Sequence, residues 1–197
     1  MISISGKHWS EKKIDKNLVE KLAQKENFSQ ILSKLIISRK FDDEEIYSIN
    51  NEIEITNVFK SNNDYQLSLD LVFNSIINKE KICILGDYDV DGSVSTSLLV
   101  NFLQKINHPY FFYIPDREKD GYGASVDLFK KLITKDPKLV ILVDCGANSH
   151  DAINYLNKNK IKSLIIDHHQ INKPFPIAYA IINPKKDNGY IQYDYLC

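Results

Sequence analysis

The spacing of apolar residues changes near residue 63, and this change predicts two regions. Before it, apolar positions recur at intervals of three and four, which is typical of amphipathic helices. The clearest of them are Leu18, Leu22, Ala23, Phe28, Ile31, Leu32, Leu35 and Ile36. The acidic run 42–45 is typical of the first turn of another short helix. We therefore expect a helical N-terminal segment over residues 1–62.

After residue 63, short and continuously apolar stretches alternate with helical patterns. The apolar stretches predict strands over 82–85, 110–114, 139–143, 163–166 and 179–182. Helices are expected over 65–79, 93–105, 125–133 and 149–159. Buried strands that alternate with helices are typical of βαβ units, which build a mostly parallel sheet with helices on both faces. The sequence therefore predicts an α/β domain over residues 63–197.

Chemically distinctive side chains directly follow the first four predicted strands. They are Asp87, Asp89 and Asp91, then Asp116 and Arg117, then Asp144, and finally Asp167, His168 and His169. Five of the 7 glycines lie in the same loops, where glycine permits tight turns and close approach of the backbone to a ligand. Because ligands of parallel sheets bind beyond the carboxyl ends of the strands, we expect these side chains to converge on one edge.

The three aspartates of the first loop favour a metal site. Carboxylates at every second position from Asp87 to Asp91 repel one another unless a cation lies among them. The alternative is a solvated acidic turn. Aspartates combined with imidazoles suit Mn²⁺, Mg²⁺ or Zn²⁺, and the absence of thiolates argues against a structural zinc site. This many carboxylates favours two ions bridged by one Asp, an arrangement that catalyses displacement at phosphorus.

Several of these residues also have simpler interpretations. Asp144 could cap the following helix, and the adjacent histidines could be ordinary surface residues. Arg117 is either an exposed cation or a phosphate contact, and Tyr122 either stacks on a base or packs within its loop. Ser93 and Ser149 are candidate N-caps, which would direct helix N-termini at a phosphate-bearing ligand.

The bulk composition limits the class of protein. The 197 residues are 43% hydrophobic, enough for one sizeable core, and their formal net charge is -1. This charge excludes a strongly basic nucleic-acid binder but permits a local basic groove. Cys83, Cys145 and Cys197 form no CxxC pair, so we expect a reducing, cytoplasmic compartment. The sequence predicts neither a signal peptide nor a membrane span.

The ordered motifs of the chain resemble those of the DHH phosphoesterase superfamily and, within it, of the RecJ family of single-strand-specific exonucleases. The motifs are DYDVDG at 87–92, DGYG at 120–123, VDCG at 143–146, DHH at 167–169 and INP at 182–184. This resemblance implies a DHH-type domain, two Mn²⁺ or Mg²⁺ ions, and stepwise 5′-to-3′ hydrolysis of single-stranded DNA to 5′-mononucleotides. It also implies a role in DNA repair and recombination, with partners such as a helicase or a single-strand-binding protein.

The resemblance also implies roles for single residues. Asp89, Asp91, Asp144 and His168 would be metal ligands, with Asp144 bridging the two ions. His169 would lie against the scissile phosphate and complete the catalytic set. Asp87 and Asp167 would orient the ligands. Arg117 would hold a substrate phosphate, and Ser149 is a further candidate substrate contact.

The sequence departs from this family at two places. Leu85 stands where some relatives have a metal-binding His, four residues before Asp89. The chain stops at Cys197, where RecJ proteins continue with another metal-binding Asp, a second catalytic domain and an OB-fold. We therefore expect the DHH domain to be incomplete at its C-terminus. The alternatives are another DHH phosphoesterase, acting on oligonucleotides or small phosphate compounds, and a non-catalytic nucleic-acid-binding remnant.

Overall fold

The computed structural model describes residues 6, 10, 13–50, 59, 62–121 and 123–186. The chain divides into two compact units, Met1–Thr56 and Asn57–Cys197. Each unit has a hydrophobic core of its own. Tyr122 and Cys197, which figured in the sequence interpretation, lie outside the described residues. The domain boundary expected at residue 62 stays a prediction.

The first unit consists of three short helices, α1 (Lys16–Glu26), α2 (Gln30–Arg39) and α3 (Asp43–Asn50). Side chains cap them, because the first N–H groups of a helix have no partner within it. At α3 the capping is reciprocal, since Glu45 N donates to Asp42 Oδ1 and Asp42 N donates to Glu45 Oε2. Leu22, Ile36 and Ile46 form a small buried core between the helices. The expected helical N-terminal segment is confirmed.

The second unit is built on a parallel sheet. Its strands are β1 (Ile82–Gly86), β2 (Tyr110–Tyr113), β3 (Leu139–Val143), β4 (Lys162–Ile166) and β5 (Ala180–Ile182). Their spatial order is β2-β1-β3-β4-β5, and every neighbouring pair is parallel. All five residues of both β1 and β3 are buried, which explains why these strands are continuously apolar in the sequence.

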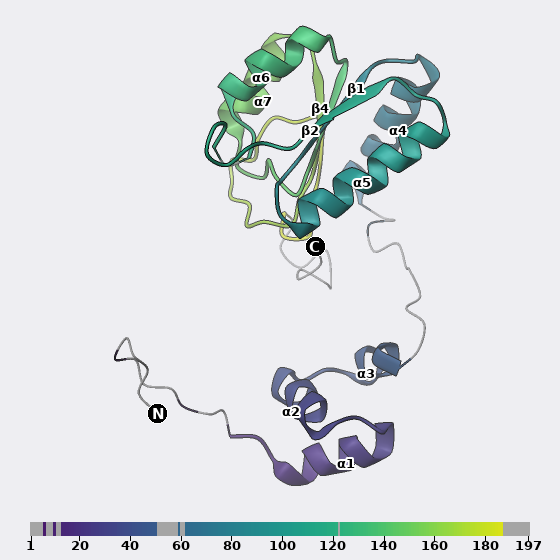
Figure 1. Ribbon diagram of the computed structural model, residues 1–197, viewed down its shortest axis with the longest axis vertical. Helices are drawn as coiled ribbons and strands as arrows, with labels where there is room; N and C mark the ends of the chain where they lie inside the picture. The colour runs from purple at the N-terminus through teal and green to yellow at the C-terminus, as the bar shows by residue number, and fades with distance from the viewer. Residues whose placement is uncertain are drawn as a thin grey trace. The chain divides into compact units, whose positions relative to one another are not determined.

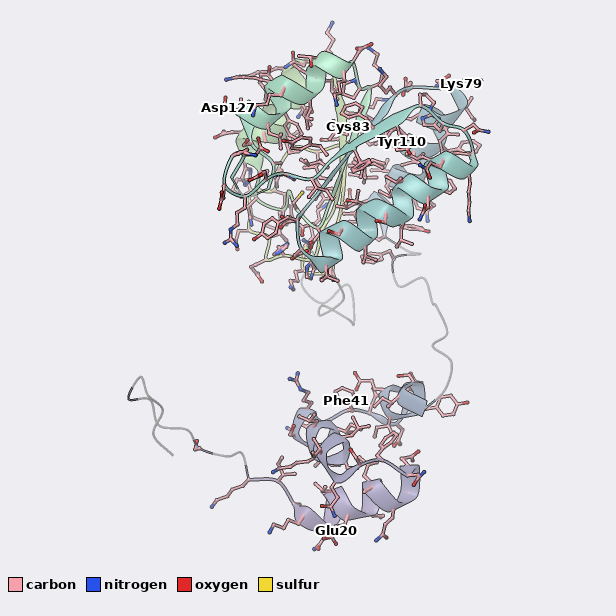
Figure 2. All side chains as sticks on the ribbon, in the orientation of Figure 1. Glu20, Phe41, Lys79, Cys83, Tyr110 and Asp127 are labelled. Atoms are coloured by element: carbon pink, nitrogen blue, oxygen red, sulfur yellow. The ribbon has the colours of Figure 1, made fainter. Side chains whose placement is uncertain are left out.

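Helices cover both faces of the sheet (Figure 1). They are α4 (Asn63–Ile77) and α5 (Val90–Lys105) on one face, and α6 (Val126–Leu132), the short 3₁₀ helix η1 (Ile133–Lys135) and α7 (His150–Lys158) on the other. Alternate strand residues face opposite sides, so Cys83, labelled in Figure 2, belongs to the core cluster that includes α6 and α7. Ile84 belongs to the cluster that includes α4 and α5. The predicted α/β fold class is confirmed. Within the described part of the chain, no helix is both long and apolar enough to cross a membrane.

The strand order reverses between β1 and β3. From β1 the chain passes through α5 to β2 at one side, whereas β3, β4 and β5 follow at the other side. Loops diverge at such a switch point and leave a crevice beyond the strand ends. Asp87 follows β1 and Asp144 follows β3, so the topology places both at this crevice.

The burial of side chains predicts that two phenylalanines contribute very differently to the free energy of unfolding. Phe129 is fully buried between α6 and the sheet, whereas Phe73 on α4 is 63% exposed. We expect Phe129→Ala to lower the free energy of unfolding by about 3–5 kcal/mol, measured by urea denaturation, because it leaves a cavity in a packed core. The control Phe73→Ala should cost less than about 1 kcal/mol. Equal losses would contradict this assignment of the core.

Candidate metal centre

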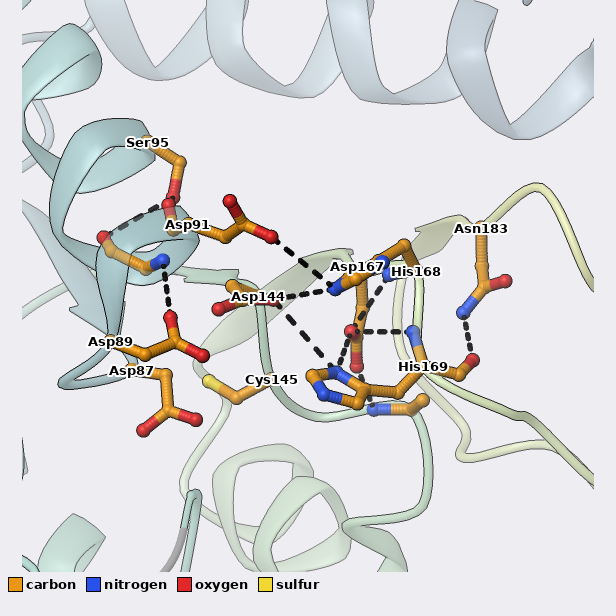
Figure 3. A network of polar contacts seen from close by, with 12 residues as sticks. Asp87, Asp89, Asp91, Ser95, Asp144, Cys145, Asp167, His168, His169 and Asn183 are labelled. Carbon is orange, nitrogen blue, oxygen red and sulfur yellow. Dashed lines mark hydrogen bonds and ion pairs between the residues drawn. The ribbon is translucent and has the colours of Figure 1, made fainter. Parts of the chain in front are cut away.

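Acidic and histidine side chains from the ends of β1, β3 and β4 meet at the switch point (Figure 3). Asp87, Asp89 and Asp144 each place one possible ligand atom within 4.8 Å of the others, and so do Asp144, His168 and His169. Asp144 belongs to both groups, which is the arrangement expected of a bridging ligand. The predicted convergence on one sheet edge is confirmed for these residues.

Asp89 makes the turn from β1 into α5. It is the N-cap of the helix, and its Oδ1 accepts a hydrogen bond from Gly92 N at 3.1 Å. This backbone donor is the main cause that lowers the pKa of Asp89 below its ordinary value. The helix therefore begins at Val90, three residues earlier than expected. The interpretation of Ser93 as its N-cap is wrong, because Asp89 occupies that position and Ser93 lies inside the helix.

Gly92 allows α5 to start directly against the backbone of Asp87. A Cβ atom at Gly92 would lie 2.4 Å from Asp87 O and 2.5 Å from Asp87 N, which no side chain tolerates. Asp87 is itself buried, and its Oδ1 accepts a hydrogen bond from Tyr88 N at 2.7 Å. The close contact explains why glycine follows the third aspartate of the motif.

Asp144 is the most constrained acid of the site. Its backbone is in the left-handed region at φ 58°, and its side chain is 5% exposed. His168 Nε2 lies 3.0 Å from Asp144 Oδ1, yet neither carboxylate oxygen has a hydrogen-bond partner among the described residues. Burial, and then the neighbouring Asp89, raise the pKa of Asp144 to about 7. A buried carboxylate without donors is the chemistry that a divalent cation satisfies.

Asp167, in contrast to Asp144, is a buried acid whose carboxylate accepts several hydrogen bonds. Its carboxylate is 1% exposed and is saturated by N–H donors. Ala147 N donates to Oδ2 at 2.8 Å, while His168 N and His169 N donate to Oδ1 at 2.8 and 3.1 Å. His169 Nδ1 also donates to Oδ1 at 2.8 Å. With its acceptors occupied in this way, Asp167 organises the loop of the two histidines.

The two histidines lie next to each other on one side of Asp144, with ring centroids 4.7 Å apart (Figure 3). His168 Nε2 is also 3.9 Å from Asp91 Oδ2, so it lies near both Asp91 at the start of α5 and Asp144. Burial is the largest single influence on the pKa of His169 and would lower it. The hydrogen bond to Asp167 and the negative charges of Asp167, Asp144 and Asp87 together outweigh burial and raise that pKa. The pairing also fixes the orientation of the His169 ring.

Arg117 approaches the site through an aromatic contact. Its guanidinium carbon lies 5.4 Å from the centre of the Tyr88 ring, in the loop between Asp87 and Asp89. The loop that carries Arg117 is braced by Asp120, which accepts hydrogen bonds from Tyr113 Oη at 2.6 Å, Asp116 N at 3.1 Å and Lys131 Nζ at 3.1 Å. The sequence interpretation gave Asp120 no role, although it begins the DGYG motif.

Ser149 occupies the N-cap position of α7, as expected, but its side chain makes no capping hydrogen bond. Cys83 and Cys145 are buried, and burial raises the pKa of Cys83 to about 12 and that of Cys145 well above its ordinary value. Both therefore remain thiols, in agreement with a site built from oxygen and nitrogen ligands.

A cavity of about 190 Å³ opens beside the candidate metal ligands. Asp91, Asp144 and His168 form its polar side. Its apolar side is formed by Phe59, Val143, Ile166, Ile182 and Pro184. The candidate centre thus borders a space large enough for part of a small substrate.

Residues 81–190 match the DHH family, N-terminal domain. The match spans more than half of the 197 residues, and the chain therefore belongs to the DHH family. This confirms the resemblance inferred from the motifs.

Several of its relatives in sequence are RecJ proteins. The chain is 29% identical over 185 residues to the single-stranded-DNA-specific exonuclease RecJ of Bacillus subtilis (strain 168), covering 92% of this chain and 23% of that protein. It is 35% identical over 118 residues to the corresponding RecJ of Haemophilus influenzae, covering 59% of this chain and 20% of that protein. The chain thus spans about a fifth to a quarter of the length of these relatives.

Solved structures agree with the fold. A crystal structure of RecJ from Thermus thermophilus in complex with Mn²⁺ superposes with a TM-score of 0.62 at 18% identity, covering 85% of this chain and 23% of that one. A crystal structure of exonuclease RecJ bound to manganese gives a TM-score of 0.58 at 23% identity, covering 70% and 33%. The β2-β1-β3-β4-β5 domain therefore has the fold of this family.

The perturbed pKa of Asp144 predicts how stability changes with pH. Between pH 3.8 and about 7 the folded, metal-free chain holds a proton on Asp144 that the unfolded chain has lost. The contribution of Asp144 to stability is therefore fully present below pH 3.8 and is lost as the pH rises through about 7.

We expect the metal-free wild type to lose more stability between about pH 5 and about pH 8 than Asp144→Asn, which cannot ionise. Urea unfolding at both pH values measures the difference. Asp70→Asn, at an exposed position of α4, controls for the loss of one negative charge. Identical pH dependence in the wild type and Asp144→Asn would show that the pKa of Asp144 is not raised.

Proposed function

We propose that this chain is the metal-binding part of a single-stranded-DNA-specific exonuclease that works 5′-to-3′ and releases 5′-mononucleotides in DNA repair and recombination. The observation that carries the proposal is the cluster around Asp144, in which side chains from three strand ends meet. Membership of the DHH family and the likeness to RecJ proteins support the reaction class. The substrate and the direction are inferred from the relatives.

Asp89, Asp91, Asp144 and His168 are the proposed metal ligands, with Asp144 shared between two Mn²⁺ or Mg²⁺ ions. The oxygens of Asp144 are buried and form no hydrogen bond among the described residues, which supports this assignment, because hard oxygen and imidazole ligands suit these cations. When bound, the ions would supply a low-pKa water and stabilise negative charge on the phosphate. Asp87 lies close enough to Asp89 and Asp144 to orient them or to share in the coordination.

The remaining residues bind and orient the substrate. His169, whose ring is fixed by Asp167, is proposed to contact the scissile phosphate. Arg117 is proposed to hold a neighbouring phosphate, with its guanidinium kept near the metal loop by Tyr88. Ser149 and the first N–H groups of α7 would add donors for an anion.

A second candidate is a DHH phosphoesterase that acts on short oligonucleotides or small phosphate compounds. The cavity beside Asp144 favours it, because a space of about 190 Å³ holds only a fragment of a nucleic acid.

One assay separates these candidates. The chain is incubated with Mn²⁺ and end-labelled single-stranded DNA, duplex DNA, dinucleotides or pyrophosphate. We expect mononucleotides from single strands, with the 5′ label released first. A preference for dinucleotides or pyrophosphate would support the second candidate. Normal Mn²⁺ binding without hydrolysis would mark a non-catalytic remnant.

Asp144→Ala should reduce kcat/KM by more than about 100-fold, because changing even an outer partner of a metal ligand costs about 10–100-fold. Asp127→Ala, on the exposed face of α6, should leave activity within about twofold of wild type. The rates are compared at saturating Mn²⁺. Full activity of Asp144→Ala would rule out its place in the centre.

Arg117→Met should raise KM for single-stranded DNA by about tenfold and change kcat little, since a lost charged phosphate contact weakens binding by about 1.5 kcal/mol or more. Lys119→Met is the matched control, because Lys119 is an exposed cation in the same loop and pairs only weakly with Asp116 at 3.4 Å. Equal effects of the two variants would indicate a general charge effect in place of a specific phosphate contact.

A further inference from the structure

The segment 182–185, which ends β5 and follows it, bonds to the backbone of all three residues of the DHH motif. Asp167 N donates to Ile182 O at 3.0 Å. Asn183 Nδ2 donates to His169 O at 3.0 Å (Figure 3), and Lys185 Nζ donates to His168 O at 2.6 Å. We call Asn183 and Lys185, with these two contacts, the carbonyl clamp.

The carbonyl clamp complements the contacts of Asp167. The N–H groups of His168 and His169 are held by the Asp167 carboxylate, while their carbonyl oxygens are held by the carbonyl clamp. No helix joins β4 to β5 in the described chain, so these bonds help to fix the loop that carries the two imidazoles, together with a bond from Asn148 Nδ2 to Gln170 O at 2.7 Å. A backbone held on both of its polar sides leaves the rings little freedom to move.

The two residues of the clamp also support each other. Asn183 is 3% exposed, and its Oδ1 accepts a hydrogen bond from Lys185 N at 2.8 Å. The next residue, Lys186, forms an ion pair with Asp64 of α4 and lies 5.6 Å from the centre of the Phe175 ring. The ion pair of Lys186 therefore ties the segment that carries the clamp to α4. This contact restricts the movement of the clamp and of the two histidines bound to it.

We propose that Asn183 and Lys185 are positioning residues that set His168 and His169 against Asp144 through their backbone carbonyls. The inference rests on the proposed function only in taking His168 as a metal ligand. Distances of 3.0 and 3.9 Å from the imidazoles to Asp144 Oδ1 depend on where this loop lies. Releasing the carbonyls should therefore weaken the metal site without removing any ligand.

Asn183→Asp and Lys185→Met test the two contacts separately. The first keeps the side-chain shape and the acceptor for Lys185 N but removes the amide donor, and the second removes the ammonium group. Two variants elsewhere break similar contacts: Asn157→Asp removes a 2.7 Å bond from Nδ2 to Ile177 O, and Lys81→Met removes a 2.8 Å bond from Nζ to Lys135 O. Lys185→Arg is the conservative variant, because it retains a cationic donor.

The first readout is Mn²⁺ affinity, measured by calorimetry on the full chain at one pH. We expect each clamp variant to bind Mn²⁺ about tenfold more weakly than the wild type. This is the lower end of the loss of metal affinity, about 10–100-fold, seen when a residue that supports a metal ligand is changed. Lys185→Arg should recover most of the affinity. Asn157→Asp and Lys81→Met should remain within about twofold of wild type.

The second readout needs no metal. In the metal-free chain, the imidazole NMR signals of His168 and His169 should shift in both clamp variants, while those of His108 and His150 stay in place. Thermal unfolding, recorded alongside, separates a general loss of stability from a local displacement of the rings. A purely structural role would lower the melting temperature but leave the affinity and the two ring signals unchanged.

Unchanged Mn²⁺ affinity and unchanged ring signals in both clamp variants would overturn the proposal, as would equal effects in the controls. If Asn183→Asp did not fold, Lys185→Met would decide by the same two readouts. Failure of the proposed function gives a different result. The wild-type chain would then bind no Mn²⁺ or hydrolyse no DNA, and the imidazole NMR signals of the metal-free clamp variants would still show whether the clamp positions the two rings.

Discussion

The buried Asp144 carboxylate is the constraint around which the C-terminal unit is arranged. Burial and a neighbouring acid oppose its ionisation, and neither of its oxygens forms a hydrogen bond within the described chain, although His168 Nε2 lies 3.0 Å from Oδ1. Such a group is costly in any fold unless something outside the protein compensates it. Asp144 stands at the switch point between β1 and β3, where the crevice is open to a ligand. The fold thus places a buried carboxylate, whose ionisation is unfavourable without a partner, where a cation can bind to it.

The contrast with Asp167 separates two uses of a buried carboxylate. Asp167 accepts hydrogen bonds from three backbone N–H groups and one imidazole, so its charge is satisfied within the protein. Asp144 has possible ligand atoms of both the aspartate group and the histidine group within 4.8 Å, but it accepts no hydrogen bond from a backbone N–H or an imidazole among the described residues. A buried carboxylate that accepts several hydrogen bonds fixes the groups that donate to it. A buried carboxylate that accepts none is more stable when it binds a metal ion. This criterion agrees with the roles proposed for the two residues and uses only their contacts.

The sequence was sufficient to predict the α/β fold, because β1 and β3 are buried on both faces and therefore continuously apolar. It also placed Asp87, Asp89, Asp144, His168 and His169 at one edge, since parallel strands bring their carboxyl ends together. It missed the start of α5, because nothing in DYDVDG shows that Asp89 serves as a helix cap. The carbonyl clamp was only partly visible: the INP motif at 182–184 includes Asn183 but indicated no role for it, since Asn183 meets His169 only when β5 returns beside β4. Lys185, which also acts on a backbone carbonyl, belongs to none of the motifs found in the sequence.

The central claim is that the Asp144 cluster holds Mn²⁺ or Mg²⁺ ions, and crystallography of the chain with Mn²⁺ tests it most directly. Anomalous diffraction collected at the manganese absorption edge locates each bound ion without reference to activity. We expect two peaks that share Asp144, one towards Asp89 and the other towards Asp91 and His168. In crystals of Asp144→Asn grown under the same conditions, both peaks should weaken. Well-ordered crystals with no peak at Asp144, or with ions bound only elsewhere on the surface, would contradict it.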